Sequence, residues 1–369
     1  MLLLASMSAA HRESHCDLLQ YVVDGSSRRV DAIVVTAGRP TRHIAPAVEL
    51  AGRLNCDLLA VCSGQVHPQK VATLAREWPK LRCHVVYLPN NYEHPLLSFK
   101  SSRMTEVADG RHGLLNIKRN ITLLVARMLG WHTVLFLDDD IFDIPDALVR
   151  RASAGIGRFA AVALTVVDWP DNSAVCHANR LAEGRQDVFV SGSALLIDAS
   201  AEFSFFPKIY NEDWLFLFDW LAAARVGRVG AVRQLRYDPF EDPERAAAEE
   251  FGEVIAEGLI DLLHRRLPAK ELTNLDYWQA FLLRRKAFIA RAAHRIAAQT
   301  QNPLNSAALL ALAAAERRRS EIAPHHCVSY VQTWRLDVQT WVERIDALKR
   351  VDRLLSAINY LDLAGNLIG

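Results

Sequence analysis

Three consecutive carboxylates, Asp138, Asp139 and Asp140, come directly after an apolar run at residues 133–137. Such a run is typical of a buried β-strand. Carboxylates at the end of a buried strand are costly unless they are paired or bind a metal ion. Their oxygen atoms suit Mg²⁺ or Mn²⁺, ions that commonly carry a diphosphate group. The feature therefore predicts a divalent-cation site at the end of this strand. A polar strand end or a helix cap is the simpler alternative.

The three carboxylates are expected to have different binding roles. Side chains alternate between the two faces of a strand, so Asp138 and Asp140 should share a side. One carboxylate would bind the cation directly, and another would hold a ribose or a metal-bound water. We predict Asp140 and Asp138 as metal ligands, and Asp138 and Asp139 as residues that bind the nucleotide.

Composition limits the class of protein. The 369 residues are 51% hydrophobic and 23% charged, which is ordinary for a globular protein with a large core. A net charge of +1 predicts no general attraction to nucleic acid or to an anionic membrane. The six cysteines form no C-x-x-C pair and are expected to be free thiols in a reducing compartment. No run approaches the roughly 18 apolar residues of a membrane span. We therefore expect a soluble, cytoplasmic protein with no nucleic-acid partner.

Residues 30–240 alternate between strand and helix patterns after a lead-in at 1–29. The predicted strands lie at 31–36, 57–62, 84–88, 133–137, 160–167, 188–198 and 229–237. Predicted helices end near 54 and cover about 67–77, 114–129 and 211–224, and residues 89–113 look irregular. This alternation predicts an α/β fold with a mostly parallel sheet flanked by helices. Ligands bind such sheets beyond the carboxyl ends of the strands.

Residues 241–369 have helical spacing and no strand signal. We expect an α-helical C-terminal region that either covers the substrate pocket or forms a homodimer contact. Trp278, Trp334 and Trp341 in this region are expected to be core or interface anchors rather than sugar platforms.

Basic residues and a glycine turn lie near the expected ligand edge. Lys118 and Arg119 come early on the helix before the acidic strand, where they could reach a diphosphate or a base. A solvated basic face is an equal alternative. The turn after the first strand, and the residue that closes the second strand, add Thr36, Ala37, Gly38, Arg39 and Ser63 as binding candidates. Glycine there allows close backbone approach, but the three-glycine dinucleotide fingerprint is absent, so NAD binding is unsupported.

Glu212 and Asp213 stand at the start of a predicted helix. Acids are favoured at this position by the helix dipole, so capping alone would explain one of them. Two acids in a sheet that already holds an acidic cluster could instead include a general base.

Together these elements resemble glycosyltransferases of the GT-A fold, in particular the family 2-like group. The matching elements are the strand and turn at residues 34–41, Arg119-Asn120, Asp138-Asp139-Asp140, Ser191-Gly192-Ser193 and Glu212-Asp213. The resemblance covers residues 31–240 and leaves 241–369 uncovered. It implies that residues 34–41 bind uridine and that the Asp-x-Asp motif binds Mn²⁺ or Mg²⁺. It also implies that the loop of Ser191, Gly192 and Ser193 contacts donor and acceptor, and that Asp213 is the base, with Glu212 beside it.

One element departs from the family pattern. Many of these enzymes carry a further metal-binding histidine after the last strand, where this chain has Arg236-Tyr237-Asp238. Asp238 is our candidate for that ligand, unless the ligand is missing.

The resemblance implies transfer of a sugar from a UDP- or GDP-type donor to an acceptor hydroxyl. Asp213 as base would give inversion, although retaining enzymes share this fold. The lack of a membrane helix favours a small soluble acceptor. A sugar-phosphate nucleotidylyltransferase, a phosphatase with Asp138 as nucleophile, and a non-catalytic nucleotide-sugar-binding protein are the alternatives. The longer glycine-rich signature of a nucleotidylyltransferase is absent from this sequence, and so is the later acidic motif of the phosphatase family.

Overall fold

A ten-stranded sheet runs through the computed structural model, which describes residues 15–23, 25–105, 114–167, 173–184, 190–363 and 367–368. Nine strands lie in the order β1-β9-β7-β8-β5-β2-β3-β4-β10, and β6 pairs with β9. The strands are β1 Gln20–Tyr21, β2 Ala32–Ala37, β3 Asp57–Cys62, β4 Cys83–Tyr87, β5 Thr133–Asp138, β6 Ile141–Phe142, β7 Ala161–Val167, β8 Ala194–Asp198, β9 Val226–Gln234 and β10 Leu367–Ile368.

The sheet is mostly parallel, as predicted. Strands β5, β2, β3 and β4 run parallel, as do β7, β9 and β1. Strand β8 is antiparallel to its neighbours β5 and β7, and the short strands β6 and β10 are also antiparallel. All six residues of β2 are buried, which a central strand needs because helices cover both faces of such a sheet. The carboxyl ends of β2, β3 and β5 therefore meet at one edge.

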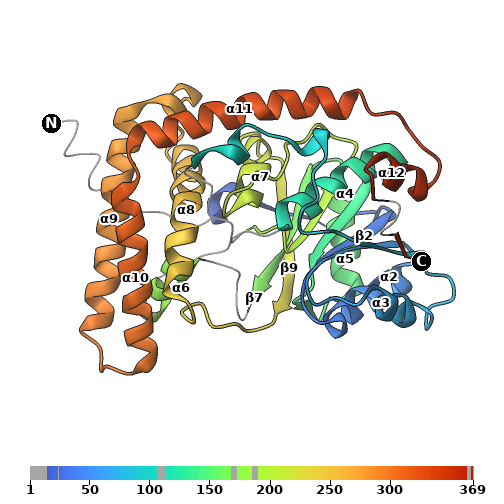
Figure 1. The fold of residues 1–369 in the computed structure, drawn as a ribbon, viewed down its shortest axis with the longest axis horizontal. Coiled ribbons are helices and arrows are strands. Elements are labelled where there is room, and N and C mark those ends of the chain that lie inside the picture. The colour runs from blue at the N-terminus through green and yellow to red at the C-terminus, as the bar shows by residue number, and fades with distance from the viewer. Residues whose placement is uncertain are drawn as a thin grey trace.

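Helices pack on both faces of the sheet (Figure 1). Helices α2 Ala45–Leu54, α3 Pro68–Ala75 and α5 Asp146–Gly155 share one core cluster with one face. Helices α4 Leu115–Leu129, α7 Glu212–Ala222, α8 Pro243–His264, α11 Pro324–Asp346 and α12 Leu354–Tyr360 share a second cluster with the other face. Helices α6 Ala174–Leu181, α9 Leu275–Ala297 and α10 Pro303–Glu321 form a third cluster with the start of α8. None of the described helices is long and apolar enough to span a membrane.

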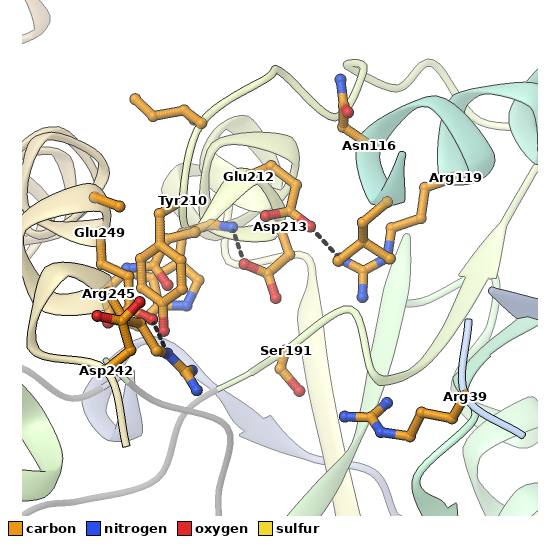
Figure 2. A pocket seen from close by; sticks show the side chains of 15 residues that line it. Arg39, Asn116, Arg119, Ser191, Tyr210, Glu212, Asp213, Asp242, Arg245 and Glu249 are labelled. Carbon is orange, nitrogen blue, oxygen red and sulfur yellow. Dashed lines mark hydrogen bonds and ion pairs between the residues drawn. The ribbon is translucent and has the colours of Figure 1, made fainter. Parts of the chain in front are cut away.

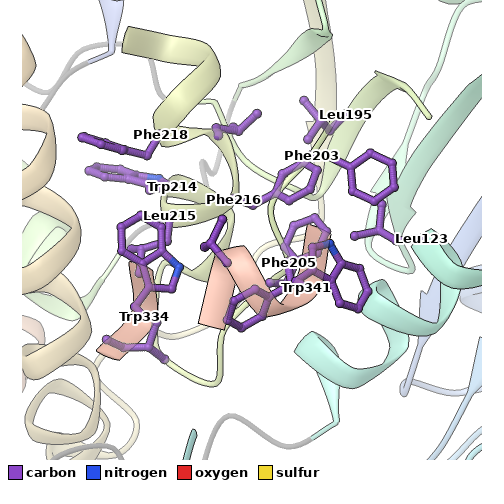
Figure 3. Packing of buried hydrophobic residues seen from close by; sticks show 14 of the residues in the cluster. Leu123, Leu195, Phe203, Phe205, Trp214, Leu215, Phe216, Phe218, Trp334 and Trp341 are labelled. Atoms are coloured by element: carbon purple, nitrogen blue, oxygen red, sulfur yellow. The ribbon is translucent and has the colours of Figure 1, made fainter. Parts of the chain in front are cut away.

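The helical C-terminal region packs on the sheet rather than standing apart. Helix α11 extends from the α9–α10 end of the molecule to α12 (Figure 1). Figure 3 shows Trp334 and Trp341 from this helix against the apolar side chains of α7 and of the segment before it. Trp334 lies 6.1 Å from Phe218 and Trp341 lies 6.2 Å from Phe205, measured between ring centroids. Both tryptophans and Trp278 are fully buried, which confirms them as core residues.

The structure differs from the sequence prediction at several strand ends. Strand β9 begins and ends three residues earlier than expected, because β6 pairs with its end at Gln234. Strand β8 begins only at Ala194, and the first two residues of the predicted strand lie outside the described residues. Strands β1 and β10 come from the lead-in and from the C-terminal region, where two-residue strands leave no alternation to detect.

Truncation of Trp341 tests whether helix α11 belongs to the core of the sheet. Trp341→Ala should lower the free energy of unfolding by about 3–5 kcal/mol, because it leaves a large cavity among fully packed rings. Leu336→Ala, at an exposed position of the same helix, should change it by less than about 0.5 kcal/mol. Urea unfolding followed by circular dichroism measures both. Equal effects would contradict the packing described here.

Candidate active site

Arg119 links the acidic strand end to the start of α7. The residue lies in the second turn of α4, and only 3% of its side chain is exposed. One terminal nitrogen donates to Glu212 Oε1 at 2.5 Å, and the other donates to both carboxylate oxygens of Asp138 at 3.1 Å. Burial lowers the pKa of Arg119, but the charges of Asp138 and Glu212 outweigh burial and raise it. A permanent positive charge therefore lies between these two acids.

Asp139 forms hydrogen bonds with the turn that follows β2. Its Oδ2 accepts hydrogen bonds from the backbone nitrogens of Gly38 at 2.7 Å and Arg39 at 2.8 Å. Its Oδ1 accepts from the Arg39 guanidinium at 2.5 Å. Beside it, Thr36 Oγ1 donates to Asp138 at 2.6 Å. Three hydrogen bonds therefore tie Asp139 to the first turn, and one lone pair remains on its Oδ1.

Asp140 keeps one carboxylate oxygen without a partner. Its Oδ2 pairs with the Arg39 guanidinium at 2.8 Å and accepts from Gln234 Nε2 at 3.1 Å. Its Oδ1 is buried and has no hydrogen bond. Burial, reinforced by the charge of Asp138, raises the pKa of Asp140 to about 6. An orphaned oxygen on a buried carboxylate, close enough to Asp138 to feel its charge, fits a cation ligand. The half-exposed guanidinium of Arg39 is the cation at this carboxylate in the structure.

The predicted base is held by backbone donors. Asp213 Oδ2 accepts from Gly192 N at 2.6 Å, and Oδ1 accepts from Trp214 N at 2.9 Å. Both bonds fix the direction of the carboxylate, and each oxygen retains a free lone pair. Burial raises the pKa of Asp213. Burial also raises the pKa of Glu212 to about 8, against the opposing charge of Arg119.

Gly192 is required by the close approach of its loop to Arg119. A Cβ at this position would lie 2.6 Å from an Arg119 nitrogen. The same loop also contacts the end of β5, because Ser193 O accepts a hydrogen bond from Asp138 N at 2.9 Å. The hydroxyls of Ser191 and Ser193 hydrogen-bond to each other. The loop therefore joins the acidic strand end and Asp213 into one unit.

Lys118 and Ser63 support the first turn from behind. Lys118 Nζ donates to Ala37 O at 2.6 Å, and Ser63 N donates to the same oxygen at 2.9 Å. Burial lowers the pKa of Lys118. Neither residue lines the cavity described next, and both hold the backbone of Ala37 in place.

A cavity of about 670 Å³ lies beside Arg119 and the Glu212-Asp213 pair, and its lining does not include Asp138, Asp139 or Asp140 (Figure 2). Its lining includes the predicted residues Arg39, Arg119, Ser191, Glu212 and Asp213. Figure 2 shows Arg39 at one end, Glu212 and Asp213 in the middle, and Asp242 and Arg245 at the other end. The sequence analysis missed Asn116, Tyr210, Asp242, Arg245 and Glu249, which also line the cavity.

Two further placements bear on metal binding. Gln234 is the β9 residue that contacts Asp140, whereas the exposed Asp238, our candidate for the third ligand, accepts a hydrogen bond from Phe240 N at 2.9 Å.

A second group of possible metal ligands lies between α6 and α8, where Cys176 Sγ and carboxylate oxygens of Glu253 and Glu257 lie within 4.8 Å of one another. The buried Arg285 pairs with Glu253 and Glu257, so this second group already contains a cation.

No protein-family model matches this chain, and no curated protein matches it.

Gly192→Ala should disturb the site through Arg119. The added methyl group has to displace a guanidinium held by two acids, so the free energy of unfolding should fall by about 1–3 kcal/mol. Gly38→Ala is the control, since its Cβ would have its nearest contact at 3.9 Å. Urea denaturation measures both variants, and a Gly192→Ala protein as stable as the control would contradict the packing.

Glu212 should make stability depend on pH. Between about pH 4.5 and pH 8 its carboxyl keeps a proton in the folded state and loses it in the unfolded chain, so the free energy of unfolding falls as pH rises. One such group contributes a slope of at most about 1.4 kcal/mol per pH unit. Glu212→Gln should remove that slope, while Glu49→Gln, at an exposed carboxylate, should leave it. A stability difference between wild type and Glu212→Gln that does not change with pH would contradict the assignment.

Proposed function

We propose that this chain is a glycosyltransferase that moves a sugar from a UDP- or GDP-type donor to an acceptor hydroxyl. The observation that carries the proposal is the connection through Arg119. A single buried guanidinium joins the acidic strand end to the Glu212-Asp213 pair, and both Arg119 and Asp213 line one cavity. The strand arrangement supports it, because the carboxyl ends of β2 and β5 are neighbours in a parallel sheet.

Asp213 is the proposed general base. The acceptor O–H gives its proton to the Asp213 carboxylate, while the acceptor oxygen forms a bond to the anomeric carbon. The bond from that carbon to the donor phosphate oxygen breaks, and the nucleoside diphosphate leaves with the electron pair. Backbone donors from Gly192 and Trp214 hold the carboxylate in one direction, and its raised pKa makes it a better proton acceptor. Attack from the side opposite the leaving group gives inversion.

Asp140 and Asp138 would hold Mn²⁺ or Mg²⁺, which neutralises charge on the leaving diphosphate when bound. The unpartnered Oδ1 of Asp140 supports this choice. Arg39 neutralises Asp139 and Asp140 in the structure, and its exposed side chain is free to turn toward a diphosphate.

Thermal unfolding with nucleotides tests the binding half of the proposal. UDP or GDP with Mn²⁺ should raise the melting temperature of the wild type, because a ligand that binds only the native state stabilises it. Asp140→Asn should lose the Mn²⁺-dependent part of the shift. Asp143→Asn, at an exposed acid three residues further on, should keep it. A shift that does not depend on Mn²⁺ or on Asp140 would contradict the metal assignment.

Turnover tests the catalytic half. Asp213→Asn should retain the nucleotide-induced shift and lose transfer or donor hydrolysis by about 10²–10⁴-fold, the usual contribution of a general base. Release of nucleoside diphosphate from UDP- and GDP-sugars measures this. Release of pyrophosphate from a nucleoside triphosphate and a sugar phosphate would favour a nucleotidylyltransferase. Binding without turnover on any acceptor would favour a non-catalytic protein.

A further inference from the structure

We infer that the end of the cavity formed by α8 is the acceptor subsite, and that it takes a neutral polyhydroxylated molecule, a sugar residue, selected by Arg245. The inference rests on the proposed function and deepens it. It concerns residues beyond 241, which the sequence resemblance leaves uncovered.

Arg245 offers hydrogen-bond donors to the cavity. The residue lies in the first turn of α8, and about a third of its side chain is exposed, at 32%. Its Nε donates to Glu249 Oε1 at 2.6 Å, and its guanidinium lies 4.7 Å from the centre of the Tyr237 ring. Among the contacts of the described residues, Nε is the one nitrogen of the Arg245 guanidinium that donates a hydrogen bond. The two terminal nitrogens therefore remain as donors on a guanidinium whose orientation is already fixed.

The charges at this end disfavour an anionic acceptor. Asp242 and Glu249 line the cavity beside Arg245, so carboxylates outnumber the cation. A phosphate or carboxylate placed there would lose hydration and face two like charges. A sugar hydroxyl both donates and accepts a hydrogen bond, so it can satisfy Arg245 and a carboxylate at once.

Tyr210, at the same end of the cavity, also suits a sugar. Tyr210 is half-buried, and Figure 2 shows its ring beside Arg245 and Asp242. A tyrosine ring presents an apolar face with a polar tip, which matches the C–H face and hydroxyl rim of a sugar.

The geometry also explains why this end serves the acceptor. Asp213 lies between Arg245 and Arg39 along the cavity in Figure 2. The donor diphosphate belongs at the Arg39 end, because Arg39 is the lining residue that pairs with Asp140, whose Oδ1 has no partner. A molecule held by Arg245 would therefore approach Asp213 from the side opposite the donor, as inversion requires.

Ligand-observed NMR on the full chain, saturated with UDP or GDP and Mn²⁺, tests the inference. The probes are methyl glucoside, methyl galactoside and methyl mannoside, with glucose 6-phosphate and glucuronate as anionic counterparts. At least one neutral glycoside should bind, and more tightly than either anion. Arg245→Gln should weaken its binding at least tenfold. Arg317→Gln removes an exposed arginine that pairs with Glu244 on the same helix at 2.7 Å, and it should leave glycoside binding unchanged.

Controls separate this inference from the proposed function. Nucleotide binding should be the same in all variants, and its absence in wild type would count against the proposed function itself. Arg245→Gln combined with Glu249→Gln removes both charges, so a folded double variant that still loses the glycoside supports a direct role. Tighter binding of the anions, no binding of any neutral glycoside, or full binding by Arg245→Gln would each overturn the inference.

Discussion

The buried contacts of Arg119, an ion pair with Asp138 and a hydrogen bond to Glu212, are the interaction on which the site depends. They connect Asp138, at the end of a central strand, with Glu212, at the start of α7. Removing one partner of such a buried arrangement leaves an uncompensated charge, which typically costs about 3–5 kcal/mol. The geometry of Asp213 follows from the same contact, because Gly192 packs against Arg119 and donates to Asp213. One guanidinium thus sets the distance between the proposed donor and base positions.

The sheet provides the rigidity that this arrangement needs. Strands β2 and β5 pair in register from Ala32 to Thr36, so the Thr36–Asp138 contact is fixed by backbone pairing before any side chain is considered. Asp139 then closes the first turn through two backbone donors. The C-terminal helices contribute on the other side, because α11 buries Trp334 and Trp341 against the segment that leads to Asp213. Sheet and helices together hold the wall of one cavity.

Much of this arrangement was predictable from local sequence. The apolar run before three acids predicted β5 with carboxylates at its end, and the resemblance placed Arg119, Gly192 and Asp213 in one site. The contact between Gln234 and Asp140 was not predictable, because it depends on the pairing of β6 with β9. Arg245 and Glu249 were missed because a helical tail reveals its apolar spacing and not which turn will face a cavity. Likewise, no local pattern distinguishes the structural role of Asp139 from the ligand role proposed for Asp140.

The most direct measurement is a crystal structure of the protein with manganese and UDP or GDP, with anomalous data at the manganese edge. The account predicts an anomalous peak at Asp140, with the diphosphate beside it and Arg39 withdrawn from that carboxylate. Arg119 should still bridge Asp138 and Glu212. An Asp140 that stays paired with Arg39, with no peak beside it and the nucleotide bound elsewhere, would contradict the central claim.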